Sequence, residues 1–439
     1  MRIPPLLFPL SLAAVVLLSG CSGWWGESEA PPLPGDRISV LAYDQQVQID
    51  PEAAKLPIAL PPVRTDADWP APDHGGGNYA LANVVDDKWD ADIGGSASRD
   101  QPLIATPVIA NGTVYTMDSG AEIRAFAADT GKELWGSDLT PEKERGEATG
   151  GGLAFDNNRL FAATGYGEVL ALNPADGSIL WRSDVKSPLR SAPTVGQGMV
   201  FVVSIDNQLI ALSADSGTTV WTHAGISESA GLLGAPSPAL FGNLLLVAYS
   251  SGELFALNAL NGREQWEDNL ASSRRGGGVM GIAAIRGQPV LTAEGSAALA
   301  ISNSGRLVAI DTRSGQRVWD QRLAGNQMPW VAGSTVFLLT SQSQLMALNL
   351  ADGKIRWLTQ LAQWENGKEH SGVISWYGPV LAGGKLWITS STGRLRSYSP
   401  EDGAEAADLD AGRAINRPPV VAGGTLYTLD DSATLTAWR

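Results

Sequence analysis

The sequence contains a single cysteine, Cys21, and three histidines among its 439 residues. One cysteine cannot form a disulfide within the chain, so the fold does not depend on disulfide pairing. His74, His223 and His370 lie far apart and none belongs to an HExxH motif, so no zinc-hydrolase site is indicated. The glycine-rich runs that end at Gly77, Gly152 and Gly278 are not followed by Lys-Ser or Lys-Thr, which argues against phosphate-binding loops.

Basic charge is also scarce. Lys and Arg number 31 against 46 Asp and Glu, which gives a formal net charge of −15. A face that binds nucleic acid needs an excess of basic side chains, so this balance argues against nucleic acid as a partner. We interpret the acidic excess as a solvated surface.

The one long apolar run lies at the N-terminus, in IPPLLFPLSLAAVVLLSG (residues 3–20). It follows Arg2, is interrupted by three prolines and ends in small residues, which favours a secretory signal over a membrane span. Its last residues, Leu18-Ser19-Gly20-Cys21, resemble the lipobox of bacterial lipoproteins. That resemblance implies that Cys21 is lipidated and becomes the mature N-terminus. Ser22, in place of an aspartate, implies the outer membrane. The alternative is an ordinary secretory signal with an incidental cysteine.

Composition changes twice after the signal. We expect residues 1–20 to be a lipoprotein signal peptide and residues 21–60, rich in proline and charge, to be a flexible tether. Residues 61–83 combine Trp69 and Tyr79 with proline and glycine. We expect this stretch to be an irregular segment that packs on the folded domain, which would occupy residues 84–439.

In contrast to these scarce residues, one sequence phrase recurs along the chain. ALNPADGSILW (residues 171–181) returns in variant form ending at Trp135, Trp221, Trp266, Trp319 and Trp357. Each copy has an alanine six residues before a glycine and a tryptophan four residues after it. The mean spacing is about 45 residues, the length of a four-stranded propeller blade. Tryptophans at the repeat position are Trp89, Trp135, Trp181, Trp221, Trp266, Trp319 and Trp357.

We interpret each repeat as four β-strands. The first carries a Pro-Val or Pro-Ala pair, the second follows a glycine turn, and the third holds the repeated alanine. A turn such as Asp176-Gly177 then leads to the tryptophan strand. We expect the indoles to fill the gaps between blades, each burying about 150–250 Å².

The two ends of the repeat region complement each other. The chain stops at LTAWR, with Ala437 at the alanine position and no tryptophan strand after it. The strand around Trp89 has no alanine strand before it, and another copy has Ala407 where tryptophan is expected. We therefore predict an all-β, eight-bladed β-propeller of four-stranded blades. The N-terminal strand around Trp89 would join the C-terminal blade and close the ring.

The phrase resembles the tryptophan-docking motif of quinoprotein-like propellers. Two families share that motif: the pyrroloquinoline-quinone alcohol dehydrogenases and the BamB lipoproteins of the outer-membrane β-barrel assembly machinery. With the lipobox, PPLPGDRISVL (residues 31–41) and SNSGRLVAIDTRSGQRVW (residues 302–319), the similarity to BamB in its alphaproteobacterial form covers nearly the whole chain.

This resemblance implies a non-catalytic scaffold without a cofactor. The protein would be anchored in the outer membrane by its lipid alone and would face the periplasm. The implied partner is the barrel-forming assembly subunit, bound through its periplasmic domains, with unfolded outer-membrane proteins as a further candidate.

In the family, partner contacts come from loops of two successive blades, which align here with residues 229–234 and 280–288. The implied contact residues are Leu232, Leu233 and Gly234 in the first loop, and Ala284 and Arg286 in the second. The sequence departs from the family pattern, because an acidic pair is replaced around Arg286 and an arginine beside the leucine pair is missing. Arg274 and Arg275 lie in an enlarged loop, residues 267–290, and could engage an acidic partner loop. A solvated pair is the alternative.

Two other functions stay open. A quinoprotein dehydrogenase needs a Ca²⁺ site of carboxylate and amide oxygens and a catalytic aspartate, and it usually has two adjacent cysteines. A chain with one cysteine cannot form such a cysteine pair. A propeller that binds carbohydrate or cell-wall material is the third reading. Trp330, Trp364, Trp376 and Tyr377 lie outside the docking position, and we interpret them as packing residues, with an interface role as the alternative.

Overall fold

The computed structural model describes residues 47–72, 76–82, 84, 86–98, 101–142, 150–189, 191–227, 236–271 and 285–439. Contacts divide the chain into Met1–Gln48 and Ile49–Arg439. Cys21 and the predicted signal peptide lie outside the described residues.

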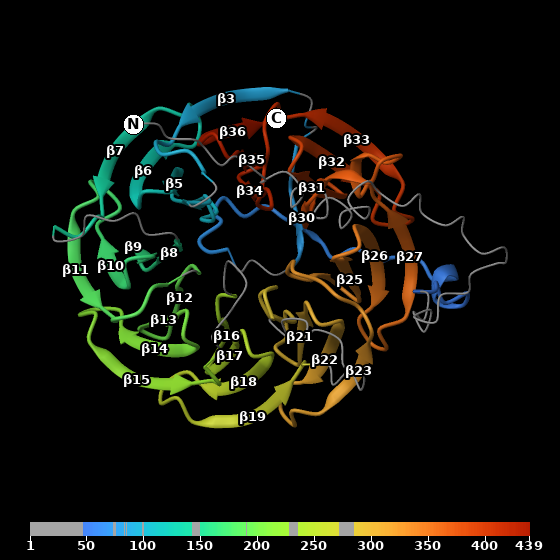
Figure 1. Ribbon diagram of the computed structural model, residues 1–439, viewed down its shortest axis with the longest axis horizontal. Helices are drawn as coiled ribbons and strands as arrows, with labels where there is room; N and C mark the ends of the chain where they lie inside the picture. Colours follow the sequence, from blue (N-terminus) through green and yellow to red (C-terminus); the bar gives the residue numbers. More distant parts are fainter. Residues whose placement is uncertain are drawn as a thin grey trace, which may run out of the picture. The chain divides into compact units, whose positions relative to one another are not determined.

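Four-stranded antiparallel sheets follow one another around a common centre, as in a β-propeller (Figure 1). In one sheet, the first strand, β16 (Ala239–Phe241), lies nearest the centre and the fourth, β19 (Glu264–Asn269), at the rim. The second and third strands are continuous buried apolar runs, because both of their faces pack against neighbouring sheets. Fourth strands such as β11 (Ile179–Asp184) and β15 (Thr219–Ala224) alternate between exposed and half-buried residues, since only one of their faces is covered.

The strands of the first half have these bounds. The first two sheets contain β4 (Val108–Ala110), β5 (Thr113–Met117), β6 (Glu122–Ala127) and β7 (Glu133–Asp138), then β8 (Gly151–Asp156), β9 (Arg159–Thr164), β10 (Glu168–Leu172) and β11 (Ile179–Asp184). The next two contain β12 (Thr194–Gly196), β13 (Met199–Val203), β14 (Gln208–Ser213) and β15 (Thr219–Ala224), then β16 (Ala239–Phe241), β17 (Leu244–Ala248), β18 (Glu253–Asn258) and β19 (Glu264–Asn269).

The second half continues the pattern with β20 (Val290–Leu291), β21 (Ala297–Ser302), β22 (Arg306–Asp311) and β23 (Arg317–Gln321), then β24 (Trp330–Ala332), β25 (Thr335–Leu339), β26 (Gln344–Asn349) and β27 (Ile355–Gln360). After the hairpin of β28 (Trp364–Asn366) and β29 (Ser371–Val373) comes the sheet of β30 (Trp376–Ala382), β31 (Lys385–Ser390), β32 (Arg394–Tyr398) and β33 (Glu405–Asp410). The chain ends with β34 (Val420–Ala422), β35 (Thr425–Leu429) and β36 (Thr434–Trp438).

The last sheet takes its fourth strand from the other end of the chain. β3 (Asp87–Asp92) pairs antiparallel with β36, and Trp89 lies opposite Ala437. The indole Nε1 of Trp89 donates to Ala128 O in the β6–β7 turn, 3.3 Å away. Strands from both ends of the repeat region therefore share one sheet, which contacts the sheet of β4–β7.

The repeated phrase is a hairpin with a fixed register. In β10 and β11, Ala171 lies opposite Trp181, and a β-bulge follows the alanine. The turn glycine, Gly177, has φ of +72°. A Cβ at Gly177 would lie 2.5 Å from the indole of Trp135, which belongs to the preceding sheet. The glycine is thus required twice, for its backbone conformation and for the indole that packs on it.

The repeat tryptophans share this contact with the next sheet. Each donates its Nε1–H to a backbone carbonyl oxygen in the turn that precedes the fourth strand of the next sheet, at 2.6 to 3.3 Å. The remaining pairs are Trp135 to Pro174, Trp181 to Ala214, Trp221 to Ala259, Trp266 to Thr312, Trp319 to Leu350 and Trp357 to Pro400.

Ala407 replaces tryptophan at one place, and the topology supplies a reason. The following sheet has no glycine turn before its fourth strand, because that strand is β3. The turn is replaced by the C-terminus, where Arg439 N donates to Asp86 O at 3.1 Å. An indole at position 407 would have no glycine to pack on.

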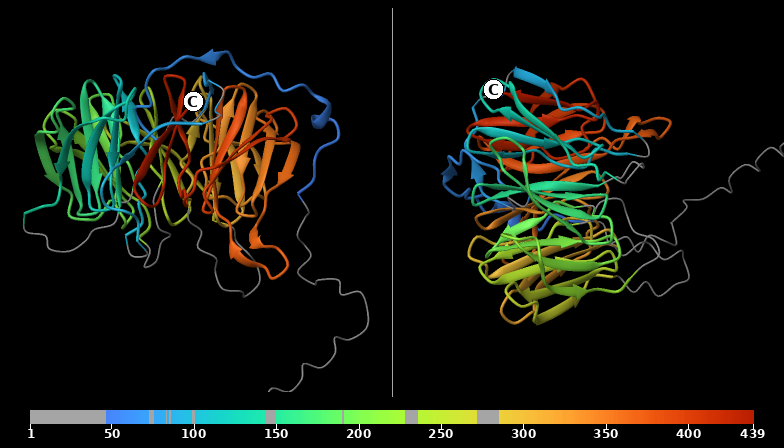
Figure 2. Two further views of the ribbon diagram at one scale, coloured as in Figure 1. Left: turned by 90° about the horizontal axis from the view of Figure 1, so that it is seen from above. Right: turned by 90° about the vertical axis from the view of Figure 1, so that its left-hand side faces the viewer.

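The described residues between 50 and 82, here called the strap, run across several sheets of the propeller (Figures 1 and 2). They include the short helix η1 (Ala53–Lys55), β1 (Val63–Arg64) and β2 (Asn78–Tyr79), and β2 pairs parallel to β30. Asp50 N donates to Ile355 O of β27 at 2.9 Å, and Ala53 is buried. The folded unit thus begins before residue 60, where the sequence placed the end of the tether, because residues 50–56 are held on β27.

The strap carries large aromatic residues into the inner part of the propeller. Trp69 exchanges backbone hydrogen bonds with Ile109 of β4 and stacks on Trp330 of β24, with ring centroids 6.2 Å apart. Tyr79 packs on Trp69 at 5.2 Å. All three rings are at most 3% exposed. The strap is therefore part of the hydrophobic core.

Candidate partner-binding face

The two faces of the propeller are formed by different turns and connections. The strap lies over the turns that join first to second strands: Gly383 N donates to Tyr79 O at 2.8 Å, and Gly423 N to Asp66 O at 3.0 Å. The opposite face, here called the contact face, is built from the turns between second and third strands and from the connections between sheets. Figure 2 shows the strap on one side and the β28–β29 hairpin on the other.

Several connections on the contact face begin next to a turn of their own sheet. Leu270 N, after β19, donates to Gly252 O in the β17–β18 turn at 2.8 Å. Leu361 N, after β27, donates to Ser343 O in the β25–β26 turn at the same distance. Because this hydrogen bond recurs, these connections start at equivalent positions in their sheets, beside the turn between the second and third strands.

The predicted contact residues belong to two of these connections. Leu232, Leu233 and Gly234 lie between β15 and β16, and Arg274, Arg275 and Ala284 between β19 and β20; all six are outside the described residues. Arg286 is described. The structure therefore locates the strands that flank the predicted loops and one of the predicted side chains.

Arg286 is exposed, while its neighbours are fixed. Ile285 is buried and forms a β-bridge with Ser302. A Cβ at Gly287 would lie 2.6 Å from Gln327 O, so the chain passes close to the next connection there. Buried residues on both sides of Arg286 fix its backbone position and leave its side chain outside.

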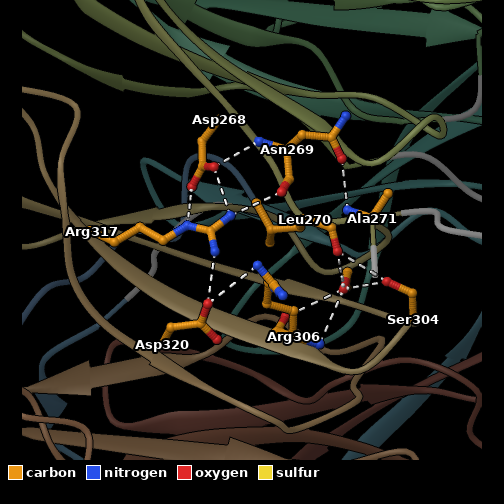
Figure 3. A network of polar contacts seen from close by, with 9 residues as sticks. Asp268, Asn269, Leu270, Ala271, Ser304, Arg306, Arg317 and Asp320 are labelled. Carbon is orange, nitrogen blue, oxygen red and sulfur yellow. Dashed lines mark hydrogen bonds and ion pairs between the residues drawn. The ribbon is translucent and has the colours of Figure 1, made fainter. Parts of the chain in front are cut away.

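A polar network holds the start of the enlarged loop (Figure 3). Arg317 of β23 donates from Nε and Nη2 to the two carboxylate oxygens of Asp268, at 2.8 and 2.7 Å, and from Nη2 to Asn269 O at 2.9 Å. Its Nη1 donates to Asp320 at 2.7 Å. These carboxylates raise the pKa of Arg317 and keep it charged.

The network continues to the next residue of the loop. Ser304 Oγ donates to Leu270 O at 3.1 Å, and Asp320 also pairs with Arg306 at 3.3 Å (Figure 3). Residues 268–271 are thereby tied to the following sheet immediately before the undescribed stretch 272–284. The sequence did not indicate this network, because Arg317 and Asp268 are 49 residues apart and belong to different repeats.

The β28–β29 hairpin stands on the contact face between β27 and β30 (Figure 2). Its two strands pair through Trp364 with Val373 and Asn366 with Ser371. Trp364 is half-buried and its ring lies 5.7 Å from that of His370, whereas Val373 is 67% exposed. Trp330 and Trp376 are buried packing residues, as interpreted from the sequence.

The inner part of the propeller contains a small apolar hollow of about 60 Å³ beside Trp69 and Trp330. A cofactor pocket usually encloses about 300–1,000 Å³. The described residues that line this hollow include no carboxylate, and a Ca²⁺-bound quinone needs carboxylate oxygens. The residues present here do not fit that cofactor.

Two further features are absent from the described residues. Among them, no three side chains of His, Cys, Asp or Glu are grouped as metal ligands. No helix in the same ranges is long and apolar enough to cross a membrane.

Comparison with known families identifies the relationship. The sequence model of the family described as outer membrane protein assembly factor BamB matches residues 119–359, more than half of the chain. The chain belongs to the BamB family. A BamB protein of Burkholderia pseudomallei is 28% identical over 345 residues, which cover 76% of this chain and 84% of that protein. A BamB protein of Yersinia pestis is 24% identical, covering 80% and 88% respectively.

Solved structures agree on the fold. BamB from Moraxella catarrhalis has a TM-score of 0.69 at 18% identity and covers 81% of this chain and all of its own. A quinohemoprotein alcohol dehydrogenase from Comamonas testosteroni has a TM-score of 0.65 at 13% identity, covering 85% and 80%. The propeller fold is thus shared by BamB and by dehydrogenases, and the fold alone does not separate their functions.

Proposed function

We propose that this protein is a non-catalytic scaffold in outer-membrane protein assembly that binds its partner through the contact face. Membership of the BamB family carries the proposal. The division of the two faces supports it, because the strap covers one face and leaves the inter-sheet connections on the other.

The scaffold would be a closed ring of eight blades. Pairing of β3 with β36 and the hydrogen bond from Trp89 to Ala128 support this closure, since they join strands from both ends of the repeat region. A closed ring has no free sheet edge and presents its connections in a fixed order.

The partner would be the barrel-forming assembly subunit, engaged through its periplasmic domains, and unfolded outer-membrane proteins are a second candidate. Arg286 supports this assignment, because it is exposed on the contact face, at the end of the enlarged loop whose start is held by Arg317. The predicted loop residues Leu232, Leu233, Gly234, Ala284, Arg274 and Arg275 complete the proposed surface.

Lipid on Cys21 would hold the protein at the outer membrane, facing the periplasm. From Cys21 to the first strap contact at Asp50 the chain has 29 peptide steps. Fully extended, such a segment spans about 95–105 Å. Substitution of Cys21 by serine should release the protein into the soluble periplasmic fraction.

An affinity pull-down tests the proposal. The tagged lipoprotein is purified from detergent-solubilised membranes, and the co-purifying proteins are identified by mass spectrometry. We expect recovery of the barrel-forming subunit, and loss of that recovery in the Leu232→Asp/Leu233→Asp variant. The matched control is Leu134→Asp/Leu180→Asp, which changes two exposed leucines of the rim strands β7 and β11.

Recovery of the lipoprotein alone would contradict the scaffold role. Dye reduction that depends on quinone and Ca²⁺ would then support the dehydrogenase alternative. Retention on cell-wall material would support the carbohydrate-binding alternative.

A further inference from the structure

The contact face contains a cavity of about 380 Å³, within the range of ligand-binding pockets. Its walls come from three inter-sheet connections, represented by Arg286, Gln327 and Trp364, and from the β25–β26 turn around Gln342. Tyr377, at the start of β30, closes one side. The cavity therefore spans consecutive sheets and includes the one described side chain of the predicted partner surface.

The charge of this cavity is opposite to that of the chain. The protein has 46 acidic and 31 basic residues, yet no Asp or Glu lines the cavity. Arg286 makes no ion pair within the described part of the chain, whereas nearby arginines such as Arg306 and Arg317 pair with Asp320. An exposed guanidinium without a carboxylate partner favours an anionic ligand.

The amides and hydroxyls that line the cavity can both donate and accept hydrogen bonds, whereas the indole of Trp364 can only donate. Burial raises the pKa of the Tyr377 hydroxyl, so it stays protonated at neutral pH, and the positive charge of Arg286 partly opposes that shift. The indole Nε1 of Trp364 makes no hydrogen bond within the described ranges. Its ring packs on that of His370, with centroids 5.7 Å apart. A ligand with acceptor oxygens can therefore use Arg286, Tyr377 and Trp364 as donors.

The hairpin adds an apolar edge. Val373 is 67% exposed beside Trp364, with which it is paired across the hairpin. A ligand that reaches both Arg286 and this edge would combine a carboxylate with an apolar or aromatic group. A peptide can place both on neighbouring side chains, whereas a neutral saccharide would leave the guanidinium without a counter-ion.

We propose that this cavity binds an acidic peptide segment of a protein partner, with a carboxylate on Arg286 and a neighbouring apolar side chain on Trp364 and Val373. The inference rests on the proposed function, because it assigns a chemistry to the partner that meets the contact face. Arg286 would be the specificity-determining residue and Trp364 the packing surface.

A titration with two matched peptides tests the inference. The full-length lipoprotein in detergent is labelled with ¹⁵N at the tryptophan indoles, and the Trp364 resonance is assigned with the Trp364→Phe variant. The probes are acetyl-Ala-Glu-Phe-Glu-amide and its twin, acetyl-Ala-Gln-Phe-Gln-amide. We compare the Arg286→Gln variant with Arg263→Gln, which changes an exposed arginine in the β18–β19 turn.

The glutamate peptide should shift the Trp364 resonance in a saturable way and bind at least about tenfold more tightly than its glutamine twin, as expected for hydrogen bonds to a charged group. Arg286→Gln should remove that difference, and Arg263→Gln should leave it unchanged. Equal binding of the two peptides, or an Arg286→Gln variant that behaves like Arg263→Gln, would overturn the inference. A shift with chitotriose and none with either peptide would replace it by a saccharide site.

The two levels of proposal can fail separately. If the pull-down recovers the assembly subunit but no peptide shifts Trp364, the scaffold stands and the cavity assignment falls. If the glutamate peptide binds but the lipoprotein is recovered alone, the cavity remains an acidic-peptide site and the assembly role falls.

Discussion

Replacement of Gly217 by alanine should reveal how the sheets are joined. Gly217 has φ of +69°, and a Cβ there would lie 2.5 Å from the Trp181 ring. A left-handed conformation costs an L-residue about 1–2 kcal/mol. Overpacking of a filled contact costs about 1–3 kcal/mol more. The free energy of unfolding should therefore fall by about 2–5 kcal/mol.

Gly198 provides a matched control. It has φ of +73° in the β12–β13 turn, and a Cβ there would meet nothing within 4 Å. Gly198→Ala should therefore cost only the backbone part, about 1–2 kcal/mol. The two substitutions differ in the presence of the indole and little else.

The Trp181→Ala variant completes a double-mutant cycle. By itself it should cost about 3–5 kcal/mol, as truncations of packed aromatic residues do. In that background the steric part of Gly217→Ala disappears, so the double variant should be about 1–3 kcal/mol more stable than the sum of the single effects predicts. Urea unfolding monitored by circular dichroism measures each term. The docking argument is refuted if Gly217→Ala costs the same as Gly198→Ala, or costs the same with and without the indole.

Three further predictions concern the core, the network and pH. Trp69→Ala should lower the free energy of unfolding by about 3–5 kcal/mol, because Trp69 is only 3% exposed and stacks on Trp330. Urea unfolding should show little loss of stability for an exposed control, Leu134→Ala. Arg317→Ala should cost about 1–3 kcal/mol by leaving Asp268 without its bidentate partner, and Arg322→Ala, an exposed control, should not. Hydrogen bonds from Ser178 hold the pKa of Asp176 below its usual range in the folded protein. Their stabilisation is therefore present above the pKa of about 3.9 that Asp176 has in the unfolded chain, and it is lost as the pH falls through the lower pKa of the folded state. The urea midpoint should thus decline from about pH 4 downward, and less steeply in Asp176→Asn; equal acid sensitivity of the two proteins would contradict this role.

The repeat phrase could be interpreted from sequence because its structure is local. Ala171 and Trp181 face each other across a short hairpin, and Gly177 supplies the turn between them. Each contact from a tryptophan to the next sheet recurs with the repeat, so periodicity alone indicated that successive units dock in the same way.

Other parts of the fold and of the contact face could not be predicted, because each occurs only once in the chain. The hydrogen bond from Trp330 Nε1 to Gly77 O joins residues 253 positions apart, and no period in the sequence relates them. The pairing of Arg317 with Asp268 and the β28–β29 hairpin are likewise specific to single connections. The cavity beside Arg286 depends on three such connections meeting, which their separate sequences do not reveal.

The amino-acid sequence by itself determined the blade, because alternation, turn chemistry and the glycine–tryptophan spacing are encoded within about a dozen residues. The spacing of those phrases also indicated the propeller and the family to which it belongs. Only the tertiary structure decided that the strap takes one face and leaves the other to Arg286 and the hairpin. The strap takes this face because of its path across several sheets. Long-range packing of Trp69 and Tyr79, and not the local preference of the backbone, fixes that path.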